Sequence, residues 1–90
     1  MATLFKTDGT IEEITPANGK KFKLEEAQKY VGGYVELLQL KKREMFICNE
    51  EGIILNLPYN SNATKKLKEV FGPFAQHLYG DIILCKINEF

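Results

Sequence analysis

The sequence predicts a single small α+β domain, with a mostly antiparallel sheet of about five or six strands and two helices packed on one face. Three observations lead to this fold class. Alternating apolar residues flank an Asp-Gly pair near the N-terminus, apolar residues recur at helical spacing in two separate segments, and short apolar runs lie between and after those segments. The predicted order is hairpin, helix, three-stranded meander, helix and strand, within residues 1–90.

The first element is a hairpin over residues 3–14. Asp8-Gly9 is a preferred pair for a two-residue hairpin turn, in which both central residues take positive φ. Pro16, Asn18 and Gly19 then supply turn chemistry, so a short loop follows the hairpin.

The first helix begins near residue 24. Leu24, Ala27 and Val31 recur at helical spacing, and two acidic residues occupy the first turn. Gly32 stands where a left-handed C-cap residue is needed, and Gly33 lets the chain turn into the next strand.

Residues 34–57 are predicted to form the three-stranded meander. Its apolar segments are 34–40, 45–49 and 53–57, separated by short polar breaks. On the first strand Glu36 shares its face with three large apolar side chains, so we expect a buried carboxylate that needs a partner.

The second helix starts after residues 60–62, any of which can cap it, and Gly72-Pro73 ends it. Its apolar stripe consists of Ala63, Leu67, Val70 and Phe71. The segment "DIILCKI" (residues 81–87) is predicted to be a last strand that is buried on both faces, or nearly so.

No stretch carries a catalytic or metal signature. Cys48 and Cys85 lie inside apolar runs, where a thiol behaves as a small hydrophobic group, so we expect a reduced pair in the core. His77 has no neighbouring nucleophile and lies in no ligand pattern. We therefore expect no catalytic residue, no metal and no cofactor.

The charge balance limits the partners. Twelve basic residues face twelve acidic ones, which disfavours generic nucleic-acid binding. Without a signal peptide or an apolar run long enough for a membrane span, the chain is expected in the cytoplasm of a host bacterium, away from membranes. Nine basic residues form three clusters, either solvated surface or a phosphate site: Lys20, Lys21, Lys23; Lys41, Lys42, Arg43; Lys65, Lys66, Lys68.

Several short motifs resemble a family of small proteins carried by phages, plasmids and integrative elements and described as a domain of unknown function. The resemblance covers residues 24–85, and the N-terminal hairpin also looks like that family's opening strand pair. The motifs are Val31-Gly32-Gly33-Tyr34 with Glu36, Asn49-Glu50-Glu51-Gly52, Leu57-Pro58 with Asn60, and Gly80-Asp81. The resemblance implies a genomic setting and no established chemistry.

Two functions are open at this point. The first is a non-enzymatic counter-defence protein of a phage or mobile element that sequesters a small nucleotide-like signal. The alternative is an accessory module that inhibits or recruits a host protein through a sheet edge or an aromatic patch. In either case we expect a homodimer or higher oligomer, because a sheet this small covers its edge or apolar patch by self-pairing.

A ligand is expected where the glycine pair, the "NEEG" turn and the "LPYN" helix start meet. The candidate ligand-binding residues are Gly32, Gly33, Glu36, Arg43, Glu51, Tyr59, Asn60, Asn62 and Lys65. Each also has a structural interpretation as turn, cap or surface residue. If the ligand interpretation holds, Tyr59→Ala and Asn60→Ala should abolish binding and leave the melting temperature nearly unchanged.

Overall fold

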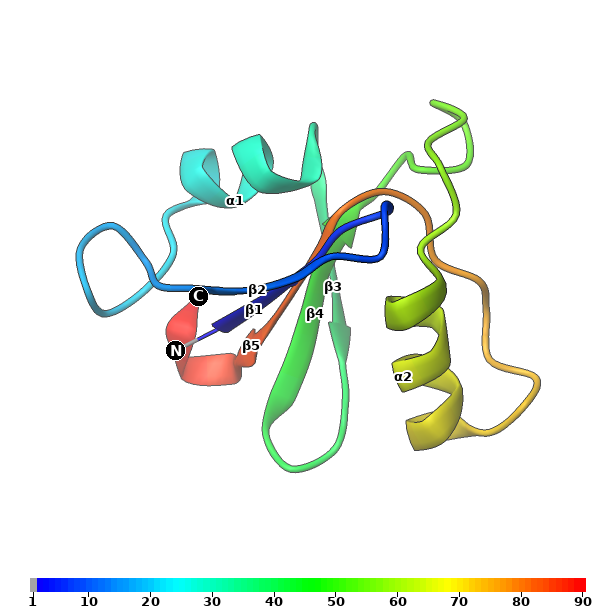
Figure 1. Cartoon of the computed structure of the whole chain (residues 1–90). Coiled ribbons are helices and arrows are strands. Elements are labelled where there is room, and N and C mark those ends of the chain that lie inside the picture. The colour runs from blue at the N-terminus through cyan, green and yellow to red at the C-terminus, as the bar shows by residue number, and fades with distance from the viewer. Residues whose placement is uncertain (1) are drawn as a thin grey trace.

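A computed structural model describes residues 2–90 and contains one five-stranded antiparallel sheet with two α-helices (Figure 1). The strands are β1 (Ala2–Phe5), β2 (Ile11–Ile14), β3 (Val35–Gln39), β4 (Glu44–Asn49) and β5 (Ile82–Lys86). The helices are α1 (Leu24–Val31), α2 (Ser61–Phe71) and the short 3-10 helix η1 (Ile87–Glu89). The strand order is β2-β1-β5-β4-β3, so the predicted α+β class is confirmed.

The helices pack on opposite faces of the sheet, and the prediction that they share one face is wrong (Figure 1). Successive residues of a strand point to opposite faces, and the central strands are apolar on both. The core under α1 comprises Ala2, Leu4, Phe22, Ala27, Val31, Met45, Ile47, Ile83 and Cys85. The core under α2 comprises Phe5, Leu40, Phe46, Cys48, Ala63, Leu67, Leu78 and Ile82.

The predicted strand over residues 53–57 is absent from the structure, which has a turn-rich segment there. Its backbone hydrogen bonds are local: Leu55 N–H donates to Glu51 O (2.8 Å), and Leu57 N–H donates to Gly52 O (3.0 Å). The place beside β4 is taken instead by β5, from the end of the chain. As a result, the side chains of Ile53 and Ile54 are 76% and 79% exposed.

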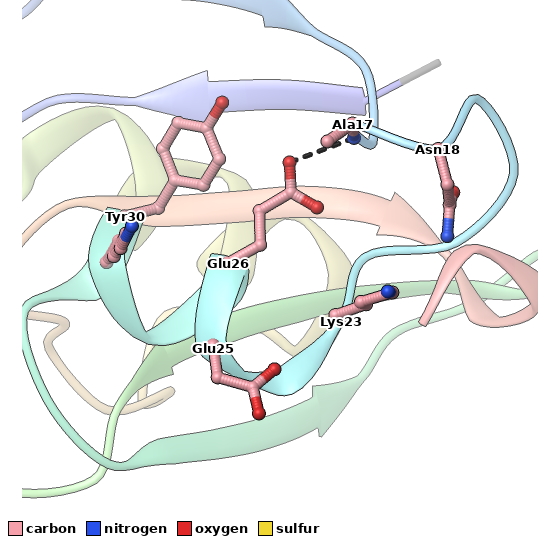
Figure 2. A pocket seen from close by; sticks show the side chains of 7 residues that line it. Ala17, Asn18, Lys23, Glu25, Glu26 and Tyr30 are labelled. Atoms are coloured by element: carbon pink, nitrogen blue, oxygen red, sulfur yellow. Dashed lines mark hydrogen bonds between the residues drawn. The ribbon is translucent and has the colours of Figure 1, made fainter.

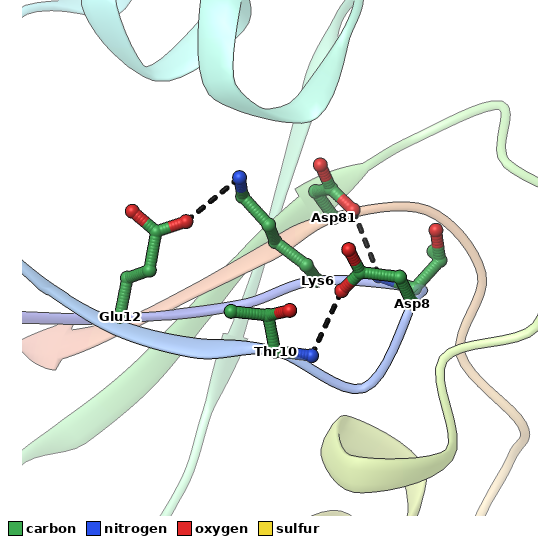
Figure 3. Close-up of polar contacts among 6 residues, drawn as sticks. Lys6, Asp8, Thr10, Glu12 and Asp81 are labelled. Atoms are coloured by element: carbon green, nitrogen blue, oxygen red, sulfur yellow. Dashed lines mark hydrogen bonds and ion pairs between the residues drawn. The ribbon is translucent and has the colours of Figure 1, made fainter.

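The N-terminal hairpin forms as predicted, with a different turn. Lys6 N–H donates to Thr10 O (2.9 Å), and Gly9 N–H donates to Lys6 O (3.1 Å), which leaves a three-residue loop. Only Gly9 has positive φ (92°), so Asp8 does not. Asp8 instead accepts a hydrogen bond from Thr10 N–H (2.8 Å), which lowers the pKa of its carboxyl group (Figure 3).

Two further contacts fix this hairpin (Figure 3). Thr7 N–H donates to the Asp81 carboxylate (3.0 Å), which ties the turn to the residue before β5. Lys6 pairs with Glu12 at 2.7 Å, and this hydrogen-bonded contact raises the pKa of the lysine.

The sequence predicted the residues that end the helices more accurately than the residues that form their buried faces. Gly32 has φ 83° at the end of α1, and Asn60 caps α2, both as predicted. Leu24 and Phe71, in contrast, were assigned to the buried stripes and are 50% and 55% exposed. Leu24 is the first residue of α1 and Phe71 the last of α2, so both stand at a helix end.

Asn60 joins three segments that are distant in sequence. Its side chain is fully buried; Nδ2 donates to Phe5 O and to Gly80 O, both at 2.8 Å. Oδ1 accepts from Ala63 N–H at 3.0 Å and so caps α2. One amide therefore connects the end of β1, the entry to β5 and the start of α2.

We expect Asn60→Ala to lower the free energy of unfolding by about 3 kcal/mol, because it removes a helix cap and two further buried hydrogen bonds. For a domain of this size the melting temperature should fall by roughly 10 °C or more. Asn62→Ala is the matched control, since Asn62 makes one exposed contact, to Gly9 O (3.2 Å). Thermal and urea unfolding measure both variants, and equal stabilities would contradict the bridging role of Asn60.

Candidate functional site

The three segments expected to form a site lie at the same end of the sheet. Beside the glycine pair, the Asn49 side chain donates to Val31 O (3.1 Å). In the "NEEG" turn, Gly52 packs on Tyr79, where an added Cβ would lie 3.2 Å from the Tyr79 carbonyl oxygen. Tyr59, in the "LPYN" segment, forms an isolated bridge with the same Tyr79. The loop before β5 thus links two of the segments.

A pocket of about 350 Å³, here called the acidic pocket, opens at this end. Its walls come from the start of β3, the end of β4, the turn after β4 and the loop before β5. The lining residues are Glu36, Cys48, Asn49, Glu50, Glu51, Gly52, Ile53, Ile54, Gln76, His77, Leu78 and Tyr79. Three of these residues, Glu36, Glu50 and Glu51, carry carboxylates. Because an ionised carboxylate only accepts hydrogen bonds, the pocket favours a ligand that presents amino or hydroxyl groups.

His77 and Tyr79 line this pocket, and Tyr59 packs against both; we call these three rings the aromatic ridge. Tyr59 packs edge-on against His77, with ring centroids 5.5 Å apart, and against Tyr79, with centroids 5.9 Å apart. Tyr59 keeps 45% of its surface exposed. The ridge therefore offers a ring for stacking to a planar ligand.

Next to the ridge lies a shallow hollow of about 460 Å³, here called the lysine depression. It is lined by Tyr59, Ser61, Thr64, Lys65, Lys68, Glu69 and Pro73. Lys68 Nζ lies 3.4 Å from His77 Nε2, so one lysine of the depression touches a ring of the ridge. The acidic pocket thus adjoins His77 and Tyr79 with three carboxylates, and the depression adjoins Tyr59 with two lysines and one carboxylate, Glu69.

Four predicted residues line these two hollows. Glu36 and Glu51 line the acidic pocket, and Tyr59 and Lys65 line the lysine depression. Glu36 is exposed, so the expectation of a buried carboxylate is wrong. The reason is that β3 is an edge strand and α2 does not cover its end.

Four other predicted residues lie outside the two hollows, and three of them make structural contacts. Asn60 is fully buried and its amide is engaged as described above, so the expectation that its replacement spares stability is wrong. Gly33 packs against Asn49, whose Nδ2 would lie 3.0 Å from an added Cβ. Gly32 lines a separate hollow of about 340 Å³. Asn62 contacts the β1–β2 turn.

Arg43 is not part of this site. It lies in the β3–β4 turn, at the other end of β4 from Asn49, and its carbonyl accepts from Ile87 N–H (2.9 Å). It therefore cannot supply the countercharge that the sequence suggested.

Sequence reasoning missed the contribution of residues 75–79. Gln76, His77 and Tyr79 lie in an irregular segment with no periodicity, so nothing in the pattern places them beside the "NEEG" turn. The available signal was the presence of two ring side chains, His77 and Tyr79, directly before the last predicted strand.

A larger pocket, of about 740 Å³, lies elsewhere, between the loop after β2 and α1 (Figure 2). It is lined by Ala17, Asn18, Lys23, Glu25, Glu26, Lys29 and Tyr30, none of which was a predicted site residue. Glu26 accepts from Ala17 N–H (3.0 Å), which holds the loop to the helix. The pocket is lined by two lysines and two glutamates, most of them exposed. This mixture of charges does not favour one class of ligand over another.

Within residues 2–90, no group of three or more histidine, cysteine, aspartate or glutamate side chains is placed to hold a metal ion. Over the same residues, no helix combines the length and apolarity needed to cross a membrane.

Comparison with known proteins gives one match. The family described as "Domain of unknown function (DUF3846)" matches residues 2–89. No curated protein and no solved structure matches the chain.

Both cysteines are free and buried, as predicted. Cys48 lines the acidic pocket, and its Sγ lies 3.5 Å from Glu36 O. Burial, followed by the charge of Glu36, raises the pKa of the Cys48 thiol to about 12. Burial, followed by the charge of Glu89, raises the pKa of Cys85 to about 12 as well. Both groups are therefore neutral thiols at physiological pH.

We expect both thiols to react slowly with a disulfide reagent in the native protein at neutral pH and rapidly in denaturant, because the thiolate is the nucleophile. Their pKa rises from 9.0 to about 12 on folding. Their contribution to stability is thus complete below pH 9 and is lost as the pH rises towards 12. Thiol titration and urea unfolding across this range measure both effects. A prompt native reaction at neutral pH would contradict the burial.

Proposed function

The chain belongs to the DUF3846 family, a domain of unknown function, and we propose that it is a non-enzymatic binding protein that sequesters a small nucleotide-like signal. The resemblance described above suggests a phage or mobile element as its source. In that setting, removal of the signal from the cytoplasm of the host bacterium blunts host defence.

One observation carries this proposal: the aromatic ridge connects the two hollows, because His77 and Tyr79 line the acidic pocket and Tyr59, which packs on both rings, lines the lysine depression. A nucleotide joins the same three chemistries, since its base is planar and carries amino groups, its sugar carries hydroxyl groups, and its phosphate is anionic. Each of these three chemistries is matched by a group in or beside the aromatic ridge.

In the proposed complex the base packs on the exposed ring of Tyr59. Glu36 and Glu51 accept hydrogen bonds from base amines or ribose hydroxyls. Lys65 and Lys68 neutralise the phosphate. The carboxylates disfavour phosphate within the acidic pocket itself, which fixes the orientation of the ligand.

The proposal includes no chemical step. The ligand is held and later released unchanged, so its recovery after incubation is part of the test. This distinguishes sequestration from hydrolysis, which would remove the same signal.

A second candidate is the protein-binding module, and a separate observation favours it. Ile53 and Ile54 are 76% and 79% exposed, and Phe74 is 99% exposed. Apolar side chains at such exposure are typical of contact surfaces for another protein. If the native chain binds a host protein and the Ile53→Ser/Ile54→Ser variant does not, this second candidate would be favoured over the first.

A thermal-shift screen against cyclic and linear nucleotides tests the first candidate. A ligand present at 100 times its dissociation constant adds about 2.7 kcal/mol of stability. The melting temperature should therefore rise by roughly 10 °C or more in a domain of this size. If no nucleotide shifts the transition, the sequestration proposal fails.

We expect Tyr59→Ala to weaken the binding of the nucleotide found in that screen by roughly fivefold or more, because base stacking on an aromatic ring contributes about 1–3 kcal/mol. Phe71→Ala is the matched control, a half-exposed ring outside both hollows.

Lys65→Ala should weaken nucleotide binding, and the effect should shrink at high salt. Lys20→Ala, an exposed lysine remote from both hollows, is its control. Equal losses in variant and control, measured by calorimetry, would place the site elsewhere.

A further inference from the structure

The two edges of the sheet are built differently. At one edge, β2 carries Glu12 and Glu13 among its four residues, and Glu12 is paired with Lys6 (Figure 3). At the other edge, the five residues of β3 read VELLQ and include one charge, Glu36. Natural sheets protect free edges with charges, prolines or bulges. By that measure β2 is protected and β3 is open to pairing.

The unpaired backbone groups of β3 can be identified. Glu50 N–H donates to Tyr34 O, and Leu40 N–H donates to Glu44 O, both at 2.8 Å. In an antiparallel ladder, bonded residues alternate along the strand, so the even positions of β3 bond to β4. Val35, Leu37 and Gln39 therefore direct their N–H and C=O groups away from β4. Within residues 2–90, no strand lies beyond them.

An apolar groove of about 420 Å³ runs along the same edge. It is lined by Leu37, Leu38, Gln39, Leu67, Phe71, Ala75 and Gln76. Leu37 is 48% exposed and Phe71 is 55% exposed. A strand added at this edge would therefore gain apolar contact as well as main-chain hydrogen bonds.

We propose that β3 pairs with β3 of a second copy of the chain, antiparallel and about a two-fold axis at Leu37. Val35 then lies opposite the partner's Gln39, and Leu37 lies opposite the partner's Leu37. All three outward residues form hydrogen-bonded pairs, and each such pair exchanges two hydrogen bonds. The two sheets become one continuous sheet across the dimer.

The charges along the strand favour this register over its neighbours. An axis at Leu37 sets Glu36 opposite the partner's Leu38, so the two carboxylates are separated. An axis at Glu36 would place two like charges directly opposite, which is destabilising. An axis at Leu38 would leave Val35 opposite Lys41 of the partner subunit, beyond the end of its strand. Leu37 is the one centre that pairs every outward residue without a like-charge contact.

Sedimentation equilibrium at micromolar concentrations tests the interface. The native chain should be a dimer, and Leu37→Lys should make it a monomer, because two ammonium groups would meet at the axis. Ile11→Lys is the matched control, since Ile11 is a half-exposed apolar residue on the opposite edge strand. A native monomer would overturn the proposal, and so would a dimer that survives Leu37→Lys or is lost in Ile11→Lys.

Site-specific cross-linking tests the register. In the proposed dimer the two Leu37 Cα atoms are about 5.5 Å apart. The two Gln39 Cα atoms are roughly 13 Å apart along the strands. A short thiol-to-thiol cross-linker should join Leu37→Cys chains and spare Gln39→Cys chains, while native Cys48 and Cys85 are buried. Equal cross-linking of both variants, or of Gln39→Cys alone, would overturn the register.

Discussion

The structure depends on one constraint: its central strands are apolar on both faces, so both faces must be covered. β4 and β5 place Met45, Ile47, Ile83 and Cys85 in one core, and Phe46, Cys48 and Ile82 in the other. Over the described residues 2–90, only two short α-helices are available for this purpose. Each helix covers part of one face, so the outer strands are only partly covered, and Ile53 and Ile54 after β4 are exposed. The exposed apolar groups of the molecule follow from that shortage.

The candidate site follows from the same arrangement. The chain must cross from β4 to α2 and return from α2 to β5, and both connections pass the same end of the sheet. Asn60 anchors that crossing, because its amide holds the ends of β1 and of the loop before β5. Tyr59 is next to this anchor and so is held in place while its ring stays accessible. A rigid residue thus positions an exposed one, and the three rings of the aromatic ridge depend on that anchor.

Local signals in the sequence predicted the elements well and their arrangement less well. The αL glycine after α1 and the Asn60 cap are decided within a few residues, and both were correct. The strand predicted at residues 53–57 failed because β5, almost 30 residues later, occupies the position beside β4. Glu36 was misjudged because edge position is set by strand order, which composition does not reveal. His77 and Tyr79 were missed because an irregular segment has no periodicity.

The two buried cysteines limit which forms of the chain can be oxidised. Cys48 belongs to the core under α2 and Cys85 to the core under α1, so the sheet itself separates them. A disulfide requires Cβ atoms about 4 Å apart with suitable directions, which two side chains on opposite faces do not provide. An internal bridge is therefore compatible only with a chain that has lost its sheet. Oxidation of the unfolded chain would trap it there, so correct folding requires a reducing environment until both thiols are enclosed.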